Sequence, residues 1–301
     1  MHVNMCPVPI LILFFYLVSG PCSSQVLKAN DTVVDTFVTI PTFQGKMDYL
    51  HGLLQDAGPD QDLLADKLHR YRDSWIAQER WEEALSLTNV LGNYFIYVSI
   101  NHKKAYEILE GYTPFILHNT DREQISFFYM THAEAATFMQ RYKESLSILD
   151  QGIAFMEKHR DSSLYEFGYA YLKAGENSDK VNEISKSVYY FEKAKKIFIH
   201  QKDTLMYLWA QNGLAQLYGK NGLYDRAWQA RREVFETGTQ IGEHQVVAVA
   251  RLTACNEANQ QGDFQEELHQ IRMALKERNQ EADVQGLSLI HISEPTRQAE
   301  I

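Results

Sequence analysis

Apolar residues recur with a helical period along most of the chain, and short turn signals interrupt them at intervals. From Gly45 onward an apolar residue stands at every third or fourth position, as on one face of an α-helix. The segment 58–60 reads Gly-Pro-Asp and ends the first of these helices, and Asp60 can cap the next one. Only seven prolines and sixteen glycines punctuate the 301 residues, which suits long helices better than many β-turns. The pattern therefore predicts an all-α chain.

The clearest helix pair lies in the segment 212–228. A large, a small and an aromatic residue share one helical face, a glycine follows, and an aromatic and a small residue open a second helix. These residues are Leu214, Ala215, Tyr218, Gly222, Tyr224 and Ala227. Ala227 is small because two helix backbones must cross closely there. The arrangement resembles the tetratricopeptide repeat (TPR), which carries these residue types at these spacings.

The pattern recurs at a fixed spacing of about 40 residues, which we call the repeat step. The positions of Tyr224 and Ala227 are occupied in the other units by Tyr142 and Ser145, by Ile184 and Ser187, and by Phe264 and Glu267. The usual TPR period is about 34 residues, so this chain resembles a variant with longer helices. Glu267 replaces the small residue, and the last pair is therefore expected either to pack loosely or to act as an end unit.

The resemblance implies a right-handed α-solenoid of about six helix hairpins over residues 45–280. The last four hairpins are expected at 122–159, 162–200, 203–240 and 243–278. The region 80–117 contains two candidate openings of a second helix, at Trp81 and after Asn101. We expect a long first helix over 80–99, a turn at Asn101 and a second helix over 103–117, because this choice keeps the repeat step to Ser145. The segment 175–180 is expected to be an enlarged turn, either a contact loop or a tolerated surface insertion.

The N-terminal residues predict export. Residues 8–18 are almost entirely apolar, but a helix needs about 20 residues to span a bilayer. Small residues follow, which predicts a secretory signal peptide over 1–24 and an extended leader over 25–44. No Lys or Arg precedes Lys28, so an uncleaved anchor is the alternative. Cleavage would remove Cys6 and Cys22 and leave Cys255 alone, as a buried and inert thiol.

The C-terminal residues break the repeat register. Residues 281–301 are expected to form a disordered tail, and Pro295 prevents a helix from running through it. The segment 287–301 resembles the conceptual translation of a transposase-type sequencing adapter. We therefore expect the natural sequence to leave this frame near Gly286, and the alternative is an authentic disordered tail.

Composition excludes some function classes. The chain is 45% hydrophobic, which is enough for a continuous core, and its net charge of −10 argues against a nucleic-acid-binding surface. Two basic clusters at helical spacing are expected to lie on exposed helix faces. They are Lys193, Lys195 and Lys196, and Arg226, Arg231 and Arg232.

No catalytic signature is present in the sequence. Glycines 219 and 222 belong to a hairpin turn and lack the spacing of a phosphate-binding loop, and no Gly-x-Ser-x-Gly occurs. The eleven histidines show neither His-Glu-x-x-His nor a zinc-type spacing with cysteine. His132 shares an apolar helical face with Phe128 and Ala136, which favours a core histidine. We expect no enzymatic activity, no cofactor and no metal.

The resemblance to TPR proteins places a concave groove along the first helices, where an extended peptide or a partner helix binds. Asn and Gln side chains can pair with a peptide backbone, and tyrosines offer apolar area with a polar tip. Carried onto this chain, the groove positions are Met130, Glu134, Tyr165, Tyr169, Asn212, Gln216, Asn256 and Asn259. The alternative is that they are simply solvent-exposed helix positions.

The order of segments resembles the extracytoplasmic sensor region of Bacteroidetes-type signalling proteins. In those proteins a TPR array is followed by a membrane helix and a histidine kinase or a helix-turn-helix module. The resemblance implies a protein–protein interaction scaffold in a periplasmic or other extracytoplasmic location, as part of a truncated signalling protein. It would meet a membrane only through a missing downstream segment or an uncleaved N-terminal segment. The competing interpretation is a free-standing periplasmic or secreted adaptor.

Overall fold

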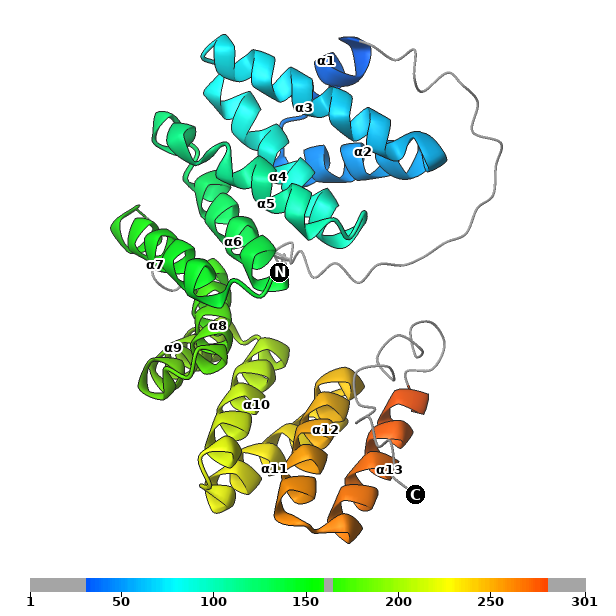
Figure 1. The fold of residues 1–301 in the computed structure, drawn as a ribbon, viewed down its shortest axis with the longest axis vertical. Helices are drawn as coiled ribbons and strands as arrows, with labels where there is room; N and C mark the ends of the chain where they lie inside the picture. The colour runs from blue at the N-terminus through cyan, green and yellow to red at the C-terminus, as the bar shows by residue number, and fades with distance from the viewer. Residues whose placement is uncertain (1–30, 160–164, 281–301) are drawn as a thin grey trace, which may run out of the picture. The chain divides into compact units, whose positions relative to one another are not determined.

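A computed structural model describes residues 31–159 and 165–280, and all regular structure in these residues is helical (Figure 1). The predicted signal peptide and adapter-like tail lie outside them. None of the helices in these ranges combines the length and apolar character that a membrane span requires. The helices in chain order are α1 (Asp31–Thr39), α2 (Phe43–Asp56), η2 (Gly58–Asp60), α3 (Gln61–Ala77), α4 (Trp81–Tyr97), α5 (His102–Glu110), η3 (Thr113–His118), α6 (Arg122–Phe138), α7 (Tyr142–His159), α8 (Tyr165–Lys180), α9 (Ile184–Gln201), α10 (Thr204–Lys220), α11 (Tyr224–Ile241), α12 (His244–Gln261) and α13 (Phe264–Gln280).

The chain divides within α3 into two compact units, one up to Tyr71 and one from Arg72 onward. An extended leader was predicted over 25–44, and this is wrong for residues 31–44, because α1 is helical and α2 begins at Phe43. Residues 25–30 lie outside the described residues. Val33, Val34 and Phe37 are buried on one face of α1. Thr and Val disfavour helices when taken alone, so burial of this face decided the conformation.

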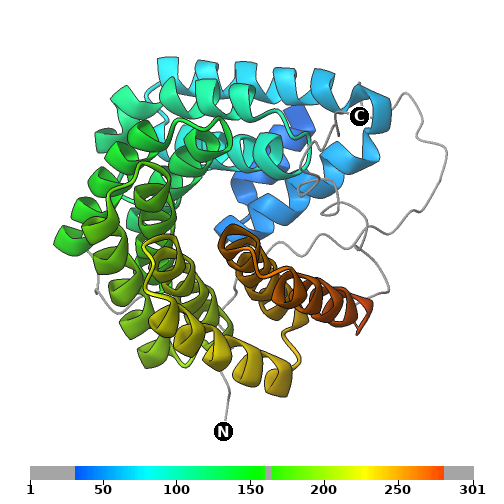
Figure 2. The same cartoon turned by 60° about the horizontal axis from the view of Figure 1, so that its bottom comes forward.

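The described residues of the second unit form five helix pairs in succession: α4 with α5, α6 with α7, α8 with α9, α10 with α11, and α12 with α13 (Figures 1 and 2). Each first helix of a pair also contacts the next first helix, whereas successive second helices lack comparable contact. The first helices therefore form the inner, more closely packed layer of the stack. The expected first hairpin is the exception, because α2 and α3 do not pack as a close pair.

The turns within the pairs repeat at the predicted step. The residue that takes a left-handed backbone conformation in each turn is, in order, Ile100, Gln140, Asn182, Gly222 and Gly262. Gly222 has φ of 73° and Gly262 of 75°, a region that glycine enters without steric cost. The repeat step found in the sequence is therefore the spacing between the left-handed residues of successive turns.

Small residues lie where the two helices of a pair cross, as predicted. Ala227 is fully buried, and Ser145 and Ser187 occupy its position in the two preceding pairs. Both hydroxyls donate to a carbonyl of the first helix twelve residues earlier, from Ser145 Oγ to Ala133 O at 2.7 Å and from Ser187 Oγ to Gly175 O at 2.8 Å. A serine is thus as compatible with the crossing as an alanine.

The last pair packs closely although Glu267 takes the small position. Its carboxylate is partly exposed and accepts a hydrogen bond from Asn259 Nδ2 at 2.8 Å. Farther along α13, the buried Glu277 lies 2.8 Å from His244 Nδ1 and 3.7 Å from Arg251 Nε. Polar side chains therefore join α12 to α13, and the expectation of loose packing is not met.

The ambiguous region 80–117 folds largely as expected. Helix α4 ends at Tyr97, the Asn101 side chain caps α5 by accepting from Lys104 N at 3.1 Å, and α5 begins at His102. The second helix is shorter than predicted, because α5 ends at Glu110 and a 3-10 helix follows. Pro114 lacks a backbone N–H and would clash with the preceding turn of a continuous α-helix.

The predicted enlarged turn at 175–180 is wrong, because α8 continues to Lys180 and the turn is the short Val181–Asn182 segment. Asn177 is buried, and its Nδ2 donates to Thr137 Oγ1 and to Ser145 Oγ, both at 2.9 Å. A polar segment favours a turn when its side chains bond to the nearby backbone. Here the partners of Asn177 are far away in the sequence, so the segment stays helical.

Candidate interaction surface on the first helices

The inner layer presents partly or fully exposed residues that repeat with the register of the stack. Each first helix from α6 onward has a small residue twelve positions before the crossing position of its pair, namely Ala133, Gly175, Ala215 and Cys255. One set directly follows this small residue, and an aromatic set lies six residues before it. Together they define the first-helix surface: Glu134, Glu176, Gln216 and Asn256, with Phe127, Tyr169 and Trp209. These positions are spaced by two helical turns on each helix, so both sets lie on the same face.

Glu134 of α6 is the polar centre of this surface. Its carboxylate accepts a hydrogen bond from Tyr97 Oη of α4 at 2.6 Å and another from Tyr169 Oη of α8 at 2.6 Å. Burial, and secondly the Glu134 charge, raise the pKa of both tyrosines, so both hydroxyls remain protonated donors. One carboxylate thus joins three successive first helices.

Lys173 adds a cation beside this centre. Its Nζ lies 3.1 Å from Glu176 Oε2 and 5.4 Å from the centroid of the Tyr169 ring. Burial alone would lower the pKa of the Lys173 ammonium, but the charges of Glu176 and Glu134 raise it above its ordinary value. Tyrosine rings and an ammonium of α8 therefore lie beside the carboxylates of Glu176 and of Glu134 from α6.

The structure brings several of the predicted groove residues together. Glu134 and Tyr169 are hydrogen-bonded, and the Tyr165 ring stacks on Tyr169 with centroids 6.5 Å apart. Met130 lies partly buried one turn before Glu134 on α6. Gln216 and Asn256 occupy the position of Glu134 in later pairs, and Asn256 is exposed.

Two predicted groove residues do not belong to the surface. Asn212 is buried, because its position three residues before the small residue turns toward neighbouring helices. Its Oδ1 has no hydrogen-bond partner among the residues that the structure describes. Asn259 is exposed but bonds to Glu267 of its own pair. Tyr97, Phe127, Lys173 and Trp209 were missed. The sequence could have predicted Phe127 and Trp209, because they lie one repeat step before and one repeat step after Tyr169.

The basic cluster around Arg231 was predicted to be exposed, and this is wrong for Arg231 itself. Its side chain is buried, and its guanidinium forms a two-pronged ion pair with Glu257 of α12, one contact being Nη1 to Oε2 at 2.7 Å. Gly219 of α10 makes room for the Glu257 carboxylate, since a Cβ there would collide with it. A helical pattern of basic residues does not reveal such a distant partner.

His132 and Cys255 are buried, as predicted. The His132 ring lies 5.0 Å from the Tyr106 ring, and its Nε2 lies 3.3 Å from Glu110 Oε2. Burial lowers the pKa of His132 to about 4, and burial also raises the pKa of the Cys255 thiol. Residues 31–159 and 165–280 contain no group of three or more His, Cys, Asp or Glu side chains that could hold a metal ion.

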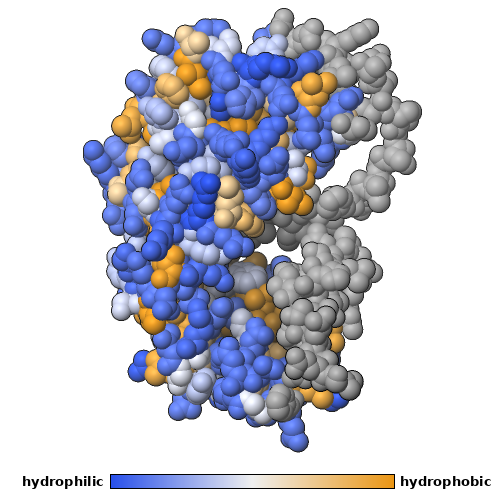
Figure 3. All heavy atoms as spheres, viewed as in Figure 1, coloured by the Kyte–Doolittle hydropathy of each residue, from blue (hydrophilic) through white to orange (hydrophobic). Residues whose placement is uncertain are grey.

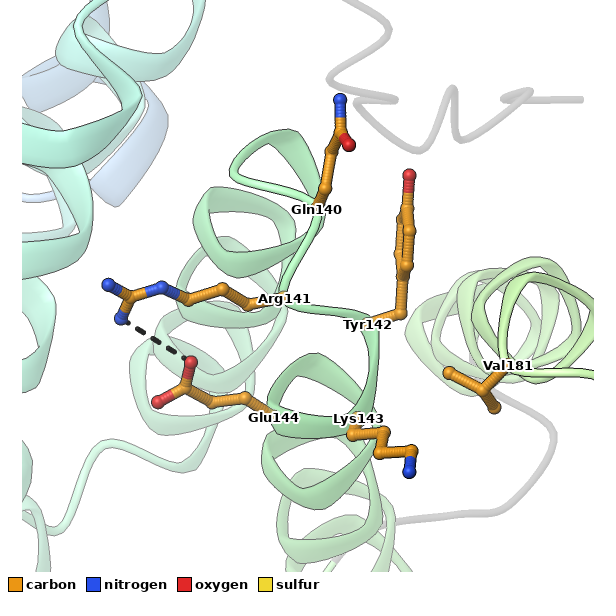
Figure 4. A pocket seen from close by; sticks show the side chains of 6 residues that line it. All are labelled: Gln140, Arg141, Tyr142, Lys143, Glu144 and Val181. Atoms are coloured by element: carbon orange, nitrogen blue, oxygen red, sulfur yellow. Dashed lines mark hydrogen bonds and ion pairs between the residues drawn. The ribbon is translucent and has the colours of Figure 1, made fainter.

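A shallow pocket lies at the edge of the stack, where the turn before α7 meets the turn before α9 (Figure 4). Its lining residues are Gln140, Arg141, Tyr142, Lys143, Glu144 and Val181. Arg141 Nη1 is 3.5 Å from Glu144 Oε2, and Glu144 also accepts from Tyr106 Oη at 2.7 Å. Its charged groups thus hold the turn together, and Figure 4 shows Tyr142 pointing away from them.

Comparison with solved structures decides the fold class. The structure of BtubC (BKLC) from P. vanneervenii matches with a TM-score of 0.58 over 84% of this chain and 97% of that chain, at 12% sequence identity. This chain has a TPR-like helical-repeat fold. A putative kinesin light chain of Podosopora anserina with TPR-like repeats matches with a TM-score of 0.45, 13% identity and coverage of 72% and 96%. The apo form of RapI matches with a TM-score of 0.45, 12% identity and coverage of 85% and 98%. No protein-family model and no curated relative matches the chain.

Proposed function

We propose that this TPR-like protein is an interaction scaffold, and that its first-helix surface binds an extended peptide or a partner helix. The observation that carries the proposal is the register of this surface, in which an aromatic and a hydrogen-bonding side chain repeat on the inner helices. The face of the molecule drawn in Figure 3 is mostly hydrophilic, with scattered apolar residues. The inner layer thus offers a repeating set of contacts, as an extended ligand requires.

The side chains of this surface suit a peptide backbone. Gln216 and Asn256 each carry an amide that can donate to a peptide carbonyl and accept from a peptide N–H. Tyr169 and Trp209 supply rigid apolar area with few rotatable bonds. Glu134 is already held by two tyrosine hydroxyls, so it is positioned before any partner arrives.

Selection of random displayed peptides on the full chain tests this proposal. Peptides that bind should lose at least tenfold in affinity, about 1.4 kcal/mol, for the double variant Gln216→Ala/Asn256→Ala. The matched control is Lys193→Ala/Lys196→Ala, which removes two exposed side chains from the second helix α9. The proposal fails if the control weakens binding as much, or if the inner double variant binds every selected peptide normally.

We propose further that the scaffold is exported, and that it is the sensor part of a signalling protein. The apolar segment 8–18, the small residues after it and the order of segments support this proposal. The free-standing adaptor remains the second candidate. Sequencing the N-terminus of exported protein should place the first residue near Gln25, and an intact N-terminus would favour a tethered form. A coding sequence that continues past Gly286 into an apolar stretch of about 20 residues would favour the sensor.

A further inference from the structure

Helix α8 places a charged pair on the first-helix surface. Lys173 lies about one turn before Glu176, and its Nζ is 3.1 Å from Glu176 Oε2. The position of Lys173 is occupied in α6, α10 and α12 by the uncharged residues Thr131, Gly213 and Thr253. Of these four first helices, α8 alone therefore sets an ammonium beside a carboxylate at these positions.

The charged pair of α8 can be reached from solvent. The Glu176 side chain is 41% exposed, and the Lys173 side chain is 26% exposed. A pair with this exposure contributes little stability, because water screens the charges and two long side chains must be held in place. A cation that fits the carboxylate better can therefore replace the Lys173 ammonium at little cost.

The surroundings of the pair favour a positive charge. Glu134 of α6 accepts a hydrogen bond from Tyr169 Oη at 2.6 Å, and this contact leaves its negative charge in place. Burial lowers the pKa of Lys173, but the charges of Glu176 and Glu134 outweigh it and raise this pKa above its ordinary value. Two carboxylates thus act on one ammonium, and one negative charge is left without a cation of its own.

Two lysines near this face lie at the turns of the stack. Lys180 ends α8 and is exposed, and Lys220 ends α10, where its Nζ is 2.6 Å from Asp179 Oδ1. Both ammonium groups would repel a second cation near the turns. They therefore favour a ligand cation on the other side of Glu176, toward Tyr169.

Two tyrosine rings lie on that side. Tyr165 and Tyr169 are one turn apart on α8, and their stacked rings have centroids 6.5 Å from each other. Lys173 Nζ already lies 5.4 Å from the Tyr169 centroid. The face of a tyrosine ring attracts cations, and a guanidinium can stack on it while its planar fork donates to a carboxylate. The arrangement suits arginine better than lysine, whose ammonium is a compact point charge.

We propose that Tyr165, Tyr169, Glu134 and Glu176 form a site for an arginine side chain of the bound peptide, and that Lys173 fills this site in the free protein. The inference rests on the proposed peptide-binding function and adds the chemical class of the ligand. The guanidinium stacks on Tyr169, bonds to Glu176 and displaces the Lys173 ammonium. The surface positions of α10 and α12 are uncharged and face uncharged residues of the same peptide.

Synthetic copies of the peptides selected on the full chain test this inference. Most of them should share an arginine at one position, and its replacement by alanine should weaken binding about tenfold. Replacement by lysine should weaken binding less. Glu176→Gln should weaken the arginine peptides about tenfold and leave their alanine versions unchanged, because the two changes remove the same contact.

The matched control is Glu192→Gln on the second helix α9. Glu192 is 43% exposed, and it pairs with Lys195 three residues later, whose Nζ lies 5.6 Å from the Tyr207 ring centroid. The control thus removes the carboxylate of a similar lysine pair outside the first-helix surface. It should bind the arginine peptides as the wild type does.

Lys173→Met gives a result that a purely structural role would not give. It removes the internal competitor, so the arginine peptides should bind about two- to fivefold more tightly. Lys195→Met is its control and should leave their affinity unchanged. Thermal unfolding should confirm that all variants are folded.

The possible failures are distinguishable. Selected peptides without a shared arginine, or equal weakening by Glu192→Gln, would overturn the arginine site and leave the peptide-binding surface standing. Weaker binding to Lys173→Met would also overturn it, because the ammonium would then belong to the ligand contact. If no peptide binds the chain, the proposed function fails, and the arginine site fails with it.

Discussion

We call the contact between the second helix of one pair and the first helix of the next pair a joint. Two joints of the stack bury a side chain at the same position of the repeat, but one side chain is apolar and the other is charged. At the joint from α9 to α10 the buried residue is Phe191, and at the joint from α11 to α12, one repeat later, it is Arg231. Both are 2% exposed. Phe191 packs against glycines 175 and 213, whereas Arg231 forms an ion pair with Glu257. The register fixes where the next helix docks, and the chemistry of the contact varies from joint to joint.

Glycine supplies the space in both cases. A Cβ on Gly213 would lie 2.5 Å from the Phe191 ring, and a Cβ on Gly219 would collide with the Glu257 carboxylate. Truncating a side chain should have a different consequence at each of the two contacts. Removing the phenyl ring leaves a cavity, whereas removing the carboxylate leaves a buried charge without its partner. Because repeats contact only their neighbours, each loss should remain local.

The largest effect is expected for Glu257→Ala. It leaves the Arg231 guanidinium buried without a carboxylate, which should destabilise this joint by about 3–5 kcal/mol. Hydrogen exchange should rise in α11 and α12 while α8 and α9 keep their protection. The double variant Arg231→Met/Glu257→Met is the control and should lose far less, because it removes both charges. Equal losses in the single and double variants would show that the ion pair is not what distinguishes this joint.

A smaller loss is expected for Phe191→Ala, about 3 kcal/mol from the transfer term and the cavity. Hydrogen exchange should rise in α8 to α10 and leave α12 unchanged. Phe191→Leu keeps most of the apolar volume and should cost clearly less. Phe191→Ala could instead raise hydrogen exchange at the joint of Arg231 as strongly as at the joint of Phe191. The two joints would then unfold as one cooperative unit, and the comparison between them would fail.

The joint before α6 offers a test by pH, since it buries His132. Its folded pKa of about 4 lies below the ordinary value of 6.5, because burial disfavours the imidazolium. The neutral ring's contribution is therefore fully present above about 6.5 and is lost as the pH falls toward 4. From about pH 7 to about pH 5 the loss should be about 2 kcal/mol.

Urea unfolding of the wild type and of His132→Phe at both pH values measures this loss. The variant should lack the part of the pH dependence that belongs to His132. Identical pH dependence in the two proteins would show that the histidine is not held neutral by its surroundings.

The smallest effects concern the helix crossings. Ser187→Ala removes the hydrogen bond to Gly175 O and should cost about 1 kcal/mol. The reciprocal Ala227→Ser places a hydroxyl in the corresponding crossing near Ala215, and it should be tolerated within about the same amount. Thermal unfolding of both variants measures the difference. A severe loss for Ala227→Ser would show that the crossings are not equivalent.

Local pattern was enough to predict the helix pairs and their register. Gly222, Gly262 and the small residue Ala227 are required by a tight turn or by a close crossing, and both constraints act within one hairpin. The turn positions followed from them, whereas the solenoid fold and the place of Glu134 and Tyr169 on the inner helices were implied by the resemblance to TPR proteins. Phe127 and Trp209 could have been found by extending the same step.

Tertiary structure decided the features that depend on partners far away in the sequence. Asn177 remains helical because Thr137 and Ser145 satisfy the hydrogen bonds of its amide. Arg231 is buried because its guanidinium pairs with the Glu257 carboxylate, for which Gly219 leaves space. Asn212 left the predicted groove because its neighbours cover it, and α1 is helical because its apolar face is buried. Short-range sterics set the repeat along the chain. The burial and pairing of polar groups are set only when the repeats stack.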